Sequence, residues 1–246
     1  MNWRLLAVGL AAYALGLLAY APATLVDATL NHASDGRLRL AEARGTIWSG
    51  AGLIEIRAAG GKSGLAKSIA WRFLPQSLLR GYLACDIRLD GADRGFQAEI
   101  HPTRIELADA TIAFPATVLG LAVPKLGALR LTGEILIRVA HFSFGLGGSQ
   151  GSAVLQWHDA GSALTAVSPL GDYQLNIDGE AAIAKVRLST LKGPLQLDGG
   201  GSWPAGGRLA FQATAIVPKP YQGQLEPLLR LIAVERSQGR FALQLN

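Results

Sequence analysis

The chain is poor in cysteine, which limits both its disulfide chemistry and its catalytic chemistry. Cys85 is the one cysteine in 246 residues, so an intrachain disulfide is excluded. Leu83, Ile87 and Leu89 alternate with polar residues around it. This alternation predicts that Cys85 points into a core as a small apolar side chain, rather than acting as a nucleophile.

Charged residues are also scarce, at 17% of the chain, and the net charge is a modest +5. The lysines and arginines form no run, whereas nucleic-acid-binding proteins usually show a clustered basic patch. The charge therefore indicates a scattered basic surface, with attraction to anionic lipid headgroups as the alternative. The mean hydropathy of +0.26 is high, which indicates strands with little polar surface or an apolar face kept for another purpose.

Catalytic motifs are missing as well. The sequence has no GxSxG, P-loop, HExxH or CxxC pattern. Residues 145–148 resemble part of a dinucleotide-binding fingerprint, but no helix is expected after them. His158 and Asp159 are adjacent in an expected strand, so their side chains should diverge. The sequence thus predicts a protein that is not an enzyme and has no catalytic, cofactor-binding or metal-binding residues.

One long segment, residues 5–26, has no charged residue. About 20 apolar residues are enough to span a bilayer as a helix, and Arg4 before the segment should stay in the cytoplasm. A cleaved signal peptide ending near residues 21–23 is the alternative. We expect residues 1–26 to be an inner-membrane anchor of a bacterium and residues 27–246 to be one domain in the periplasm.

Beyond residue 30, apolar and polar residues alternate with period two almost everywhere, as in residues 53–57, 69–73 and 83–89. Gly-rich turns separate these runs, and residues 49–52 and Asp90-Gly91 are the expected turns of two hairpins. The pattern predicts an all-β domain of about fifteen short strands. Short connections favour a mostly antiparallel sheet that is extended, curved or folded over.

Few segments have helical spacing. Residues 225–234 predict one short helix near the C-terminus, and residues 116–123 predict a short helix or a capping loop. Residues 71–91 and 157–179 share the order Trp, Pro, Gly, Tyr, apolar strand, Asp-Gly. This order indicates two duplicated β-meanders, with chance recurrence of common turn signals as the alternative.

The tryptophans are the most distinctive side chains. Trp3 lies at the expected membrane boundary, where indoles are enriched. Trp48, Trp71, Trp157 and Trp203 each lie in or beside an expected strand and near glycine. They indicate core packing, in which a large ring fills the space that glycine leaves, or else an aromatic patch that binds a partner or an acyl chain.

Several motifs follow one another along the chain. They are Gly45-Thr46-Ile47-Trp48-Ser49-Gly50, Trp71 with Pro75, Leu155-Gln156-Trp157, Pro169-Leu170-Gly171-Asp172-Tyr173, and residues 191–199 with Trp203. Together they resemble the type II secretion system protein N family (GspN), over almost the whole chain.

The resemblance implies an inner-membrane protein with a large periplasmic β domain. Such a protein would be an accessory component of the machine that exports folded proteins across the outer membrane. Its partners would be other type II secretion subunits, in the inner-membrane platform or the secretin. The resemblance brings no catalytic residues, and the matching positions are structural: Gly45, Thr46, Trp48, Gly50, Trp71, Trp157, Gly171, Tyr173, Gly193, Pro194, Leu195 and Gly199.

Three functions follow from these expectations. The first is a structural subunit that offers edge strands to other periplasmic components. The second is a lipid-binding or lipid-transfer protein with an open apolar β groove, which the high hydropathy favours. The third, a periplasmic hydrolase, would need a nucleophile and a base that the sequence does not show.

Overall fold

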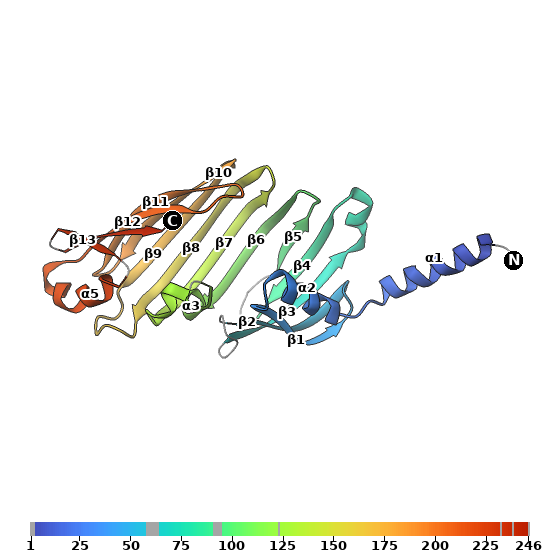
Figure 1. The fold of residues 1–246 in the computed structure, drawn as a ribbon, viewed down its shortest axis with the longest axis horizontal. Coiled ribbons are helices and arrows are strands. Elements are labelled where there is room, and N and C mark those ends of the chain that lie inside the picture. The colour runs from blue at the N-terminus through green and yellow to red at the C-terminus, as the bar shows by residue number, and fades with distance from the viewer. Residues whose placement is uncertain are drawn as a thin grey trace.

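The computed structural model describes residues 3–57, 64–90, 95–122, 124–231, 233–237 and 239–245. These residues form one open sheet of 14 strands, in the order β1 to β12 followed by β14 and then β13 (Figure 1). Each strand from β2 to β11 therefore lies between its two neighbours in sequence. All pairs are antiparallel, which confirms the predicted mostly antiparallel β fold.

The strands differ widely in length. The first half of the sheet comprises β1 (Leu38–Gly45), β2 (Ser49–Arg57), β3 (Gly64–Leu74), β4 (Leu83–Leu89), β5 (Phe96–Ile100), β6 (Arg104–Pro115) and β7 (Leu131–Gly145). The second half comprises β8 (Gly148–Ser162), β9 (Gly171–Ala181), β10 (Ile183–Lys192), β11 (Gln196–Pro204), β12 (Ala210–Ile216), β13 (Val234–Ser237) and β14 (Arg240–Leu245).

Among the described residues, five helices and two 3-10 turns accompany the strands. They are α1 (Trp3–Ala19), α2 (Thr24–Ala33), α3 (Thr117–Ala122), α4 (Pro124–Gly127) and α5 (Gln222–Leu229), with the 3-10 turns η1 (Pro75–Arg80) and η2 (Lys219–Tyr221). Helix α3 confirms the predicted helix near residue 116. Helix α5 confirms the predicted C-terminal helix, but it ends at Leu229, and β13 occupies the end of the segment predicted as helix.

The strands form because their side chains alternate between a buried and an exposed face. Strand β12 is the clearest case: Phe211, Ala213 and Ala215 are buried, while Gln212 and Thr214 between them are exposed. This is the period of two that a half-buried strand requires. The alternation that predicted the strands therefore has its physical basis in a single covered face.

The sheet is curved, and its C-terminal part folds over. One core cluster joins Ile135 of β7 with Ala215 of β12, Phe241 of β14 and Leu225 of α5. Residues four or more strands apart in the sheet can share a core only when the sheet bends toward itself. A smaller cluster at the other end joins Ala23 with Leu40, Trp71 and Cys85, so each end has a core of its own.

Helix α1 projects from the β1 end of the sheet and buries none of its residues (Figure 1). Among the residues that the structure describes, no helix is long and apolar enough to cross a membrane. The predicted membrane-spanning helix over residues 5–26 is therefore not confirmed.

The apolar segment is interrupted where it meets the sheet. Helix α1 ends at Ala19, and α2 begins at Thr24 and runs across the expected domain boundary at residues 26 and 27. Between the helices, the amide of Ile47 donates to the carbonyl of Ala21 (2.9 Å), and the amide of Ala23 donates to the carbonyl of Gly45 (3.1 Å). The first turn of the sheet thus takes backbone groups that a continuous helix would need.

The structure differs from the expected positions of two turns. The first turn does not lie at residues 49–52, because Gly45 is already opposite Gly50 and the chain turns over residues 46–48. Asp178 lies within β9, opposite Ser152 and Lys185, rather than at a turn. Gly91 of the other Asp-Gly pair lies outside the described residues.

The proposed duplication stays a prediction, and its two copies do not share a register. Trp71 is opposite Ile87 on β4, whereas Trp157 is opposite Tyr173 on β9. The matching tyrosine of the first copy, Tyr82, lies in the turn before β4. Equivalent residues in the two copies therefore occupy different positions in the sheet.

Candidate functional site

An apolar cleft of about 520 Å³ lies between α2 and strands β1 to β4. Every lining side chain except that of Thr29 is apolar. The lining residues are Leu25, Val26, Thr29, Leu30, Leu40, Ile47, Trp48, Ile54, Ile69, Trp71, Phe73, Leu83, Cys85 and Ile87. Such a lining suits an apolar ligand and leaves few groups to orient a polar one.

Helix α2 is held over the cleft by Asp27. Its carboxylate accepts hydrogen bonds from the Arg39 guanidinium (3.0 and 3.1 Å) and from the backbone amide of Leu40 (2.8 Å). The Arg39 hydrogen bond and the Leu40 amide hold the pKa of Asp27 below its ordinary value. The carboxylate is therefore ionised at neutral pH and fixes α2 to the edge strand β1.

The first turn, residues 45–50, closes one end of the cleft. Gly45 has φ +90°, which side-chain-bearing residues rarely adopt. Thr46 Oγ1 accepts a hydrogen bond of 3.2 Å from the amide of Ser49, which tightens the turn. The indole N–H of Trp48 donates to the carbonyl of Leu18 (2.9 Å), so the turn is bonded to the end of α1.

Trp48 and Trp71 form part of the apolar wall. The indole N–H of Trp71 donates to the carbonyl of Ile47 (3.0 Å), and the Trp48 ring meets Phe73 edge-on with centroids 6.3 Å apart. Gly50 lies against Trp71, because a Cβ there would be 2.5 Å from the indole ring. Both indole N–H groups are used by backbone carbonyls, which leaves apolar ring surface for the cleft.

Cys85 lies in the same wall and is 5% exposed. Burial raises the pKa of its thiol, so the thiol stays protonated at neutral pH. The predicted core position of Cys85 is confirmed.

The second group of sequence-predicted residues lies further along the sheet, on β8, β9 and the turn before β11. Trp157 on β8 packs against Tyr173 on β9 with ring centroids 5.9 Å apart, and its indole N–H donates to the carbonyl of Thr132 (3.0 Å). The buried Tyr173 hydroxyl donates to the carbonyl of Leu195 (2.9 Å). Tyr173 thereby ties β9 to the turn before β11.

Glycines allow the backbone segments of this second group to approach each other closely. A Cβ on Gly193, which has φ +126°, would lie 2.3 Å from Cα of Gly171. Pro194 follows in the turn, and the buried Leu195 joins the folded-over core. Gly199 lies further along β11, where a Cβ would be 2.6 Å from Ala213.

The structure therefore brings Gly45, Thr46, Trp48, Gly50 and Trp71 together at the cleft. It places Trp157, Gly171, Tyr173, Gly193, Pro194 and Leu195 in a separate packing cluster, with Gly199 beside it. The two groups do not form one site. Trp203 differs from the other strand tryptophans, since it is 41% exposed and packs on Phe144.

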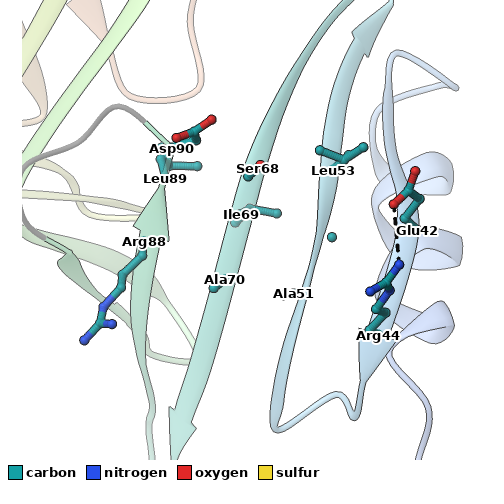
Figure 2. A pocket seen from close by; sticks show the side chains of 11 residues that line it. Glu42, Arg44, Ala51, Leu53, Ser68, Ile69, Ala70, Arg88, Leu89 and Asp90 are labelled. Atoms are coloured by element: carbon teal, nitrogen blue, oxygen red, sulfur yellow. Dashed lines mark ion pairs between the residues drawn. The ribbon is translucent and has the colours of Figure 1, made fainter.

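A second hollow, of about 440 Å³, lies on strands β1 to β4. Figure 2 shows Glu42 and Arg44 on one side of it, joined by an ion pair of 3.8 Å, and Arg88 and Asp90 on the other. The Glu42 and Arg44 side chains are largely exposed, so water competes with their interaction. We consider the apolar cleft the better-built site.

Sequence reasoning missed two polar clusters. His158 pairs with Asp172 on β9 (3.6 Å) rather than with Asp159, whose amide donates to Asp172 (2.9 Å). Burial opposes ionisation of Asp172, but the Asp159 amide and Lys192 outweigh it and lower its pKa. The other cluster consists of Glu99, His101 and Glu106. Its three side chains could be placed together only once the pairing of β5 with β6 was known.

The comparison with known protein families agrees with the motifs. The family described as type II secretion system (T2SS), protein N, matches residues 36–244. No curated protein and no solved structure matches the chain. The match begins just before β1 and ends in β14, so it covers the whole sheet, including the cleft strands and the Tyr173 cluster. The chain therefore belongs to the type II secretion system protein N family.

Proposed function

We propose that this chain is a non-enzymatic accessory scaffold of type II secretion, anchored in the bacterial inner membrane with its sheet in the periplasm. Its family supports involvement in type II secretion. Helix α1, which has no charged residue after Arg4 and buries none of its residues against the sheet, supports the anchor and its orientation.

The observation that carries the proposal is a difference between the two edges of the sheet. At the β1 edge, the amide of Leu38 donates to Ser34 Oγ (2.9 Å) and the amide of Leu40 donates to Asp27 (2.8 Å). The carbonyl of Gly45 accepts from the amide of Ala23 (3.1 Å). These groups would otherwise be free to pair with another strand, so α2 and the segment before it protect this edge.

The opposite edge is strand β13. Within the described residues, β14 is the one strand that pairs with it, and Val234 at its start is 70% exposed. An extended segment of another protein can add to such an edge through backbone hydrogen bonds. We assign β13 as the docking edge for another type II secretion subunit, of the inner-membrane platform or the secretin.

Site-specific photocrosslinking tests this assignment. The full chain carries a photoreactive residue at Val234 in a cell with a working type II secretion system. The matched control carries it at Glu42, which is exposed on the protected β1 edge. We expect crosslinks from Val234 to a secretion subunit and none from Glu42. Equal crosslinks from both positions, or none from Val234, would contradict the proposal.

The apolar cleft supports a second candidate, the binding of one acyl chain of a lipid. Its walls are apolar, and Trp48 ties it to the end of α1, where a membrane lipid would be nearest on the proposed topology. Solvent extraction and mass spectrometry of the full-length protein should find bound acyl lipid. Leu30→Arg, which places a charge in the cleft wall, should remove it while circular dichroism stays unchanged. An extract without lipid, or equal lipid in this variant, would rule out the candidate.

A further inference from the structure

The β5–β6 hairpin carries three potential metal ligands on its polar face. Glu99 on β5 and Glu106 on β6 are directly opposite each other in the register. His101 lies on the connecting turn, where its backbone amide donates to the carbonyl of Arg104 (2.8 Å). Side chains two residues apart on a strand share a face, so His101 lies on the same side as Glu99. The hairpin itself therefore brings the three side chains together.

The distances fit a single small cation. His101 Nε2 lies 3.3 Å from Glu99 Oε2 and 3.5 Å from Glu106 Oε1. One ligand atom from each of the three residues lies within 4.8 Å of the others. A tetrahedral zinc site with bonds of about 2.0–2.1 Å has ligand–ligand edges of about 3.3–3.4 Å. The two measured separations are close to that edge.

The His101 ring cannot satisfy both carboxylates by hydrogen bonding. Nε2 of a neutral imidazole carries one proton or one lone pair, and even a protonated ring has one N–H at this atom. It cannot make a linear hydrogen bond to two carboxylates at once. In the described part of the chain, Glu99 has no other hydrogen-bond or ion-pair partner than His101. A cation between the three groups would satisfy both carboxylates and the ring.

Neighbouring side chains hold the three ligands in place. The Tyr82 ring stacks on His101 with centroids 4.9 Å apart and an interplanar angle of 22°. The guanidinium of Arg104 donates to Glu106 Oε1, the same oxygen that faces His101, and His141 Nε2 lies 4.0 Å from Glu106 Oε2. Metal ligands usually have such outer partners, which orient the ring and the carboxylates.

We propose that Glu99, His101 and Glu106 bind a divalent transition-metal ion of the zinc class. One imidazole with two carboxylates suits zinc better than calcium or magnesium, which prefer oxygen ligands alone. Glu99, His101 and Glu106 are between 19% and 35% exposed, so an ion can reach them. The ion would join β5, a strand of five residues, to β6.

Zinc titration of the full-length protein tests the site. The protein is purified without a histidine tag, stripped with a chelator, and titrated with Zn²⁺ in a calorimeter. We expect one equivalent to bind and to raise the melting temperature, because an ion that binds the folded state stabilises it. Mg²⁺ at the same concentration should do neither.

Three variants locate the ion. Glu99→Gln, His101→Gln and Glu106→Gln should each weaken zinc binding about tenfold or more and remove the thermal shift. Glu99→Gln is the cleanest of the three, because Glu106→Gln also breaks the ion pair with Arg104. His32→Gln, on exposed α2, is the matched control and should bind as the natural chain does.

Two results would overturn the proposal. One is the absence of zinc binding at micromolar concentration by a chain whose circular dichroism shows it folded. The other is equal binding by Glu99→Gln, His101→Gln and the natural chain, which would mean an adventitious ion only. Either result leaves the docking edge at β13 unaffected, since the two proposals involve different strands.

Discussion

The indole N–H of Trp48 donates a 2.9 Å hydrogen bond to the carbonyl oxygen of Leu18, and so bonds the first turn of the sheet to the end of α1. Two backbone hydrogen bonds, from Ala23 to Gly45 and from Ile47 to Ala21, reinforce the connection. Helix α1 is therefore not joined to the sheet by a loose linker. The C-terminal end of α1 is therefore hydrogen-bonded, through Trp48, to the turn that lines the cleft and follows β1.

Trp48→Phe should loosen this connection. The phenylalanine keeps an aromatic ring against Phe73 but loses the hydrogen bond, at a cost of about 1 kcal/mol. Hydrogen exchange should become faster at the amides of Ala23 and Ile47. Trp203→Phe is the control, because its indole also donates to a backbone carbonyl, that of Gly207, at the far end. Unchanged exchange at Ala23 and Ile47 in Trp48→Phe would contradict the prediction.

Gly50→Ala should destabilise the sheet by about 1–3 kcal/mol. The added Cβ would lie 2.5 Å from the Trp71 ring and 2.6 Å from the carbonyl oxygen of Arg44, and backbone cannot easily yield. Urea unfolding of the two chains measures the difference. Gly147→Ala, in a turn where no heavy atom lies within 4 Å of the new Cβ, should be nearly neutral. Equal effects of the two substitutions would show that the Trp71 contact does not matter.

Tyr173→Phe should cost about 1–2 kcal/mol, because the buried Leu195 carbonyl loses its hydrogen-bond donor. Burial raises the pKa of the Tyr173 hydroxyl, with a further contribution from Asp172, so the donor proton is present throughout the physiological range. Urea unfolding of the variant measures the loss. Tyr221→Phe, at an exposed tyrosine, should have no measurable effect, and a comparable loss there would refute the assignment.

Asp27→Asn should remove an acid-sensitive part of the stability. The pKa of Asp27 in the folded chain is below its ordinary value of 3.8, so the unfolded chain binds the proton first as pH falls. The stabilisation from its ionised form is therefore present above about pH 4 and is lost as pH falls through the lowered pKa. Melting temperatures of the two chains should differ most near neutral pH and converge toward pH 3.

The control for this prediction is Asp198→Asn, which removes the same charge from an exposed position on β11. It should lower the melting temperature less than Asp27→Asn at neutral pH. A pH-independent gap between the natural chain and Asp27→Asn would mean that the Arg39 and Leu40 contacts do not depend on the charge.

The sequence predicted the sheet well, because the period-two pattern follows directly from one covered face. Phe211, Ala213 and Ala215 on β12 alternate with polar residues and are buried as expected. Cys85 could be assigned to a core on the same ground. The matching family residues were found by order alone, and the structure shows that Trp71 and Tyr173 belong to different parts of the sheet.

Features that depend on contacts between distant parts could not be predicted. Helix α2 looked like the end of an apolar segment, yet it is fixed by Asp27 and Ser34 bonding to β1. The metal-ligand cluster depends on Glu99 lying opposite Glu106. Pro102 marks a turn near residues 101–104, but it does not fix the register that brings the two carboxylates together.

Strand β13 precedes β14 in the chain but lies outside it in the sheet, so the final strand inserts between β12 and β13. The proposed docking edge is consequently assembled last. A chain whose β14 is displaced has no β13 edge to offer, although β1 to β12 can still be paired. A partner that binds this edge would therefore select chains in which β14 is in place.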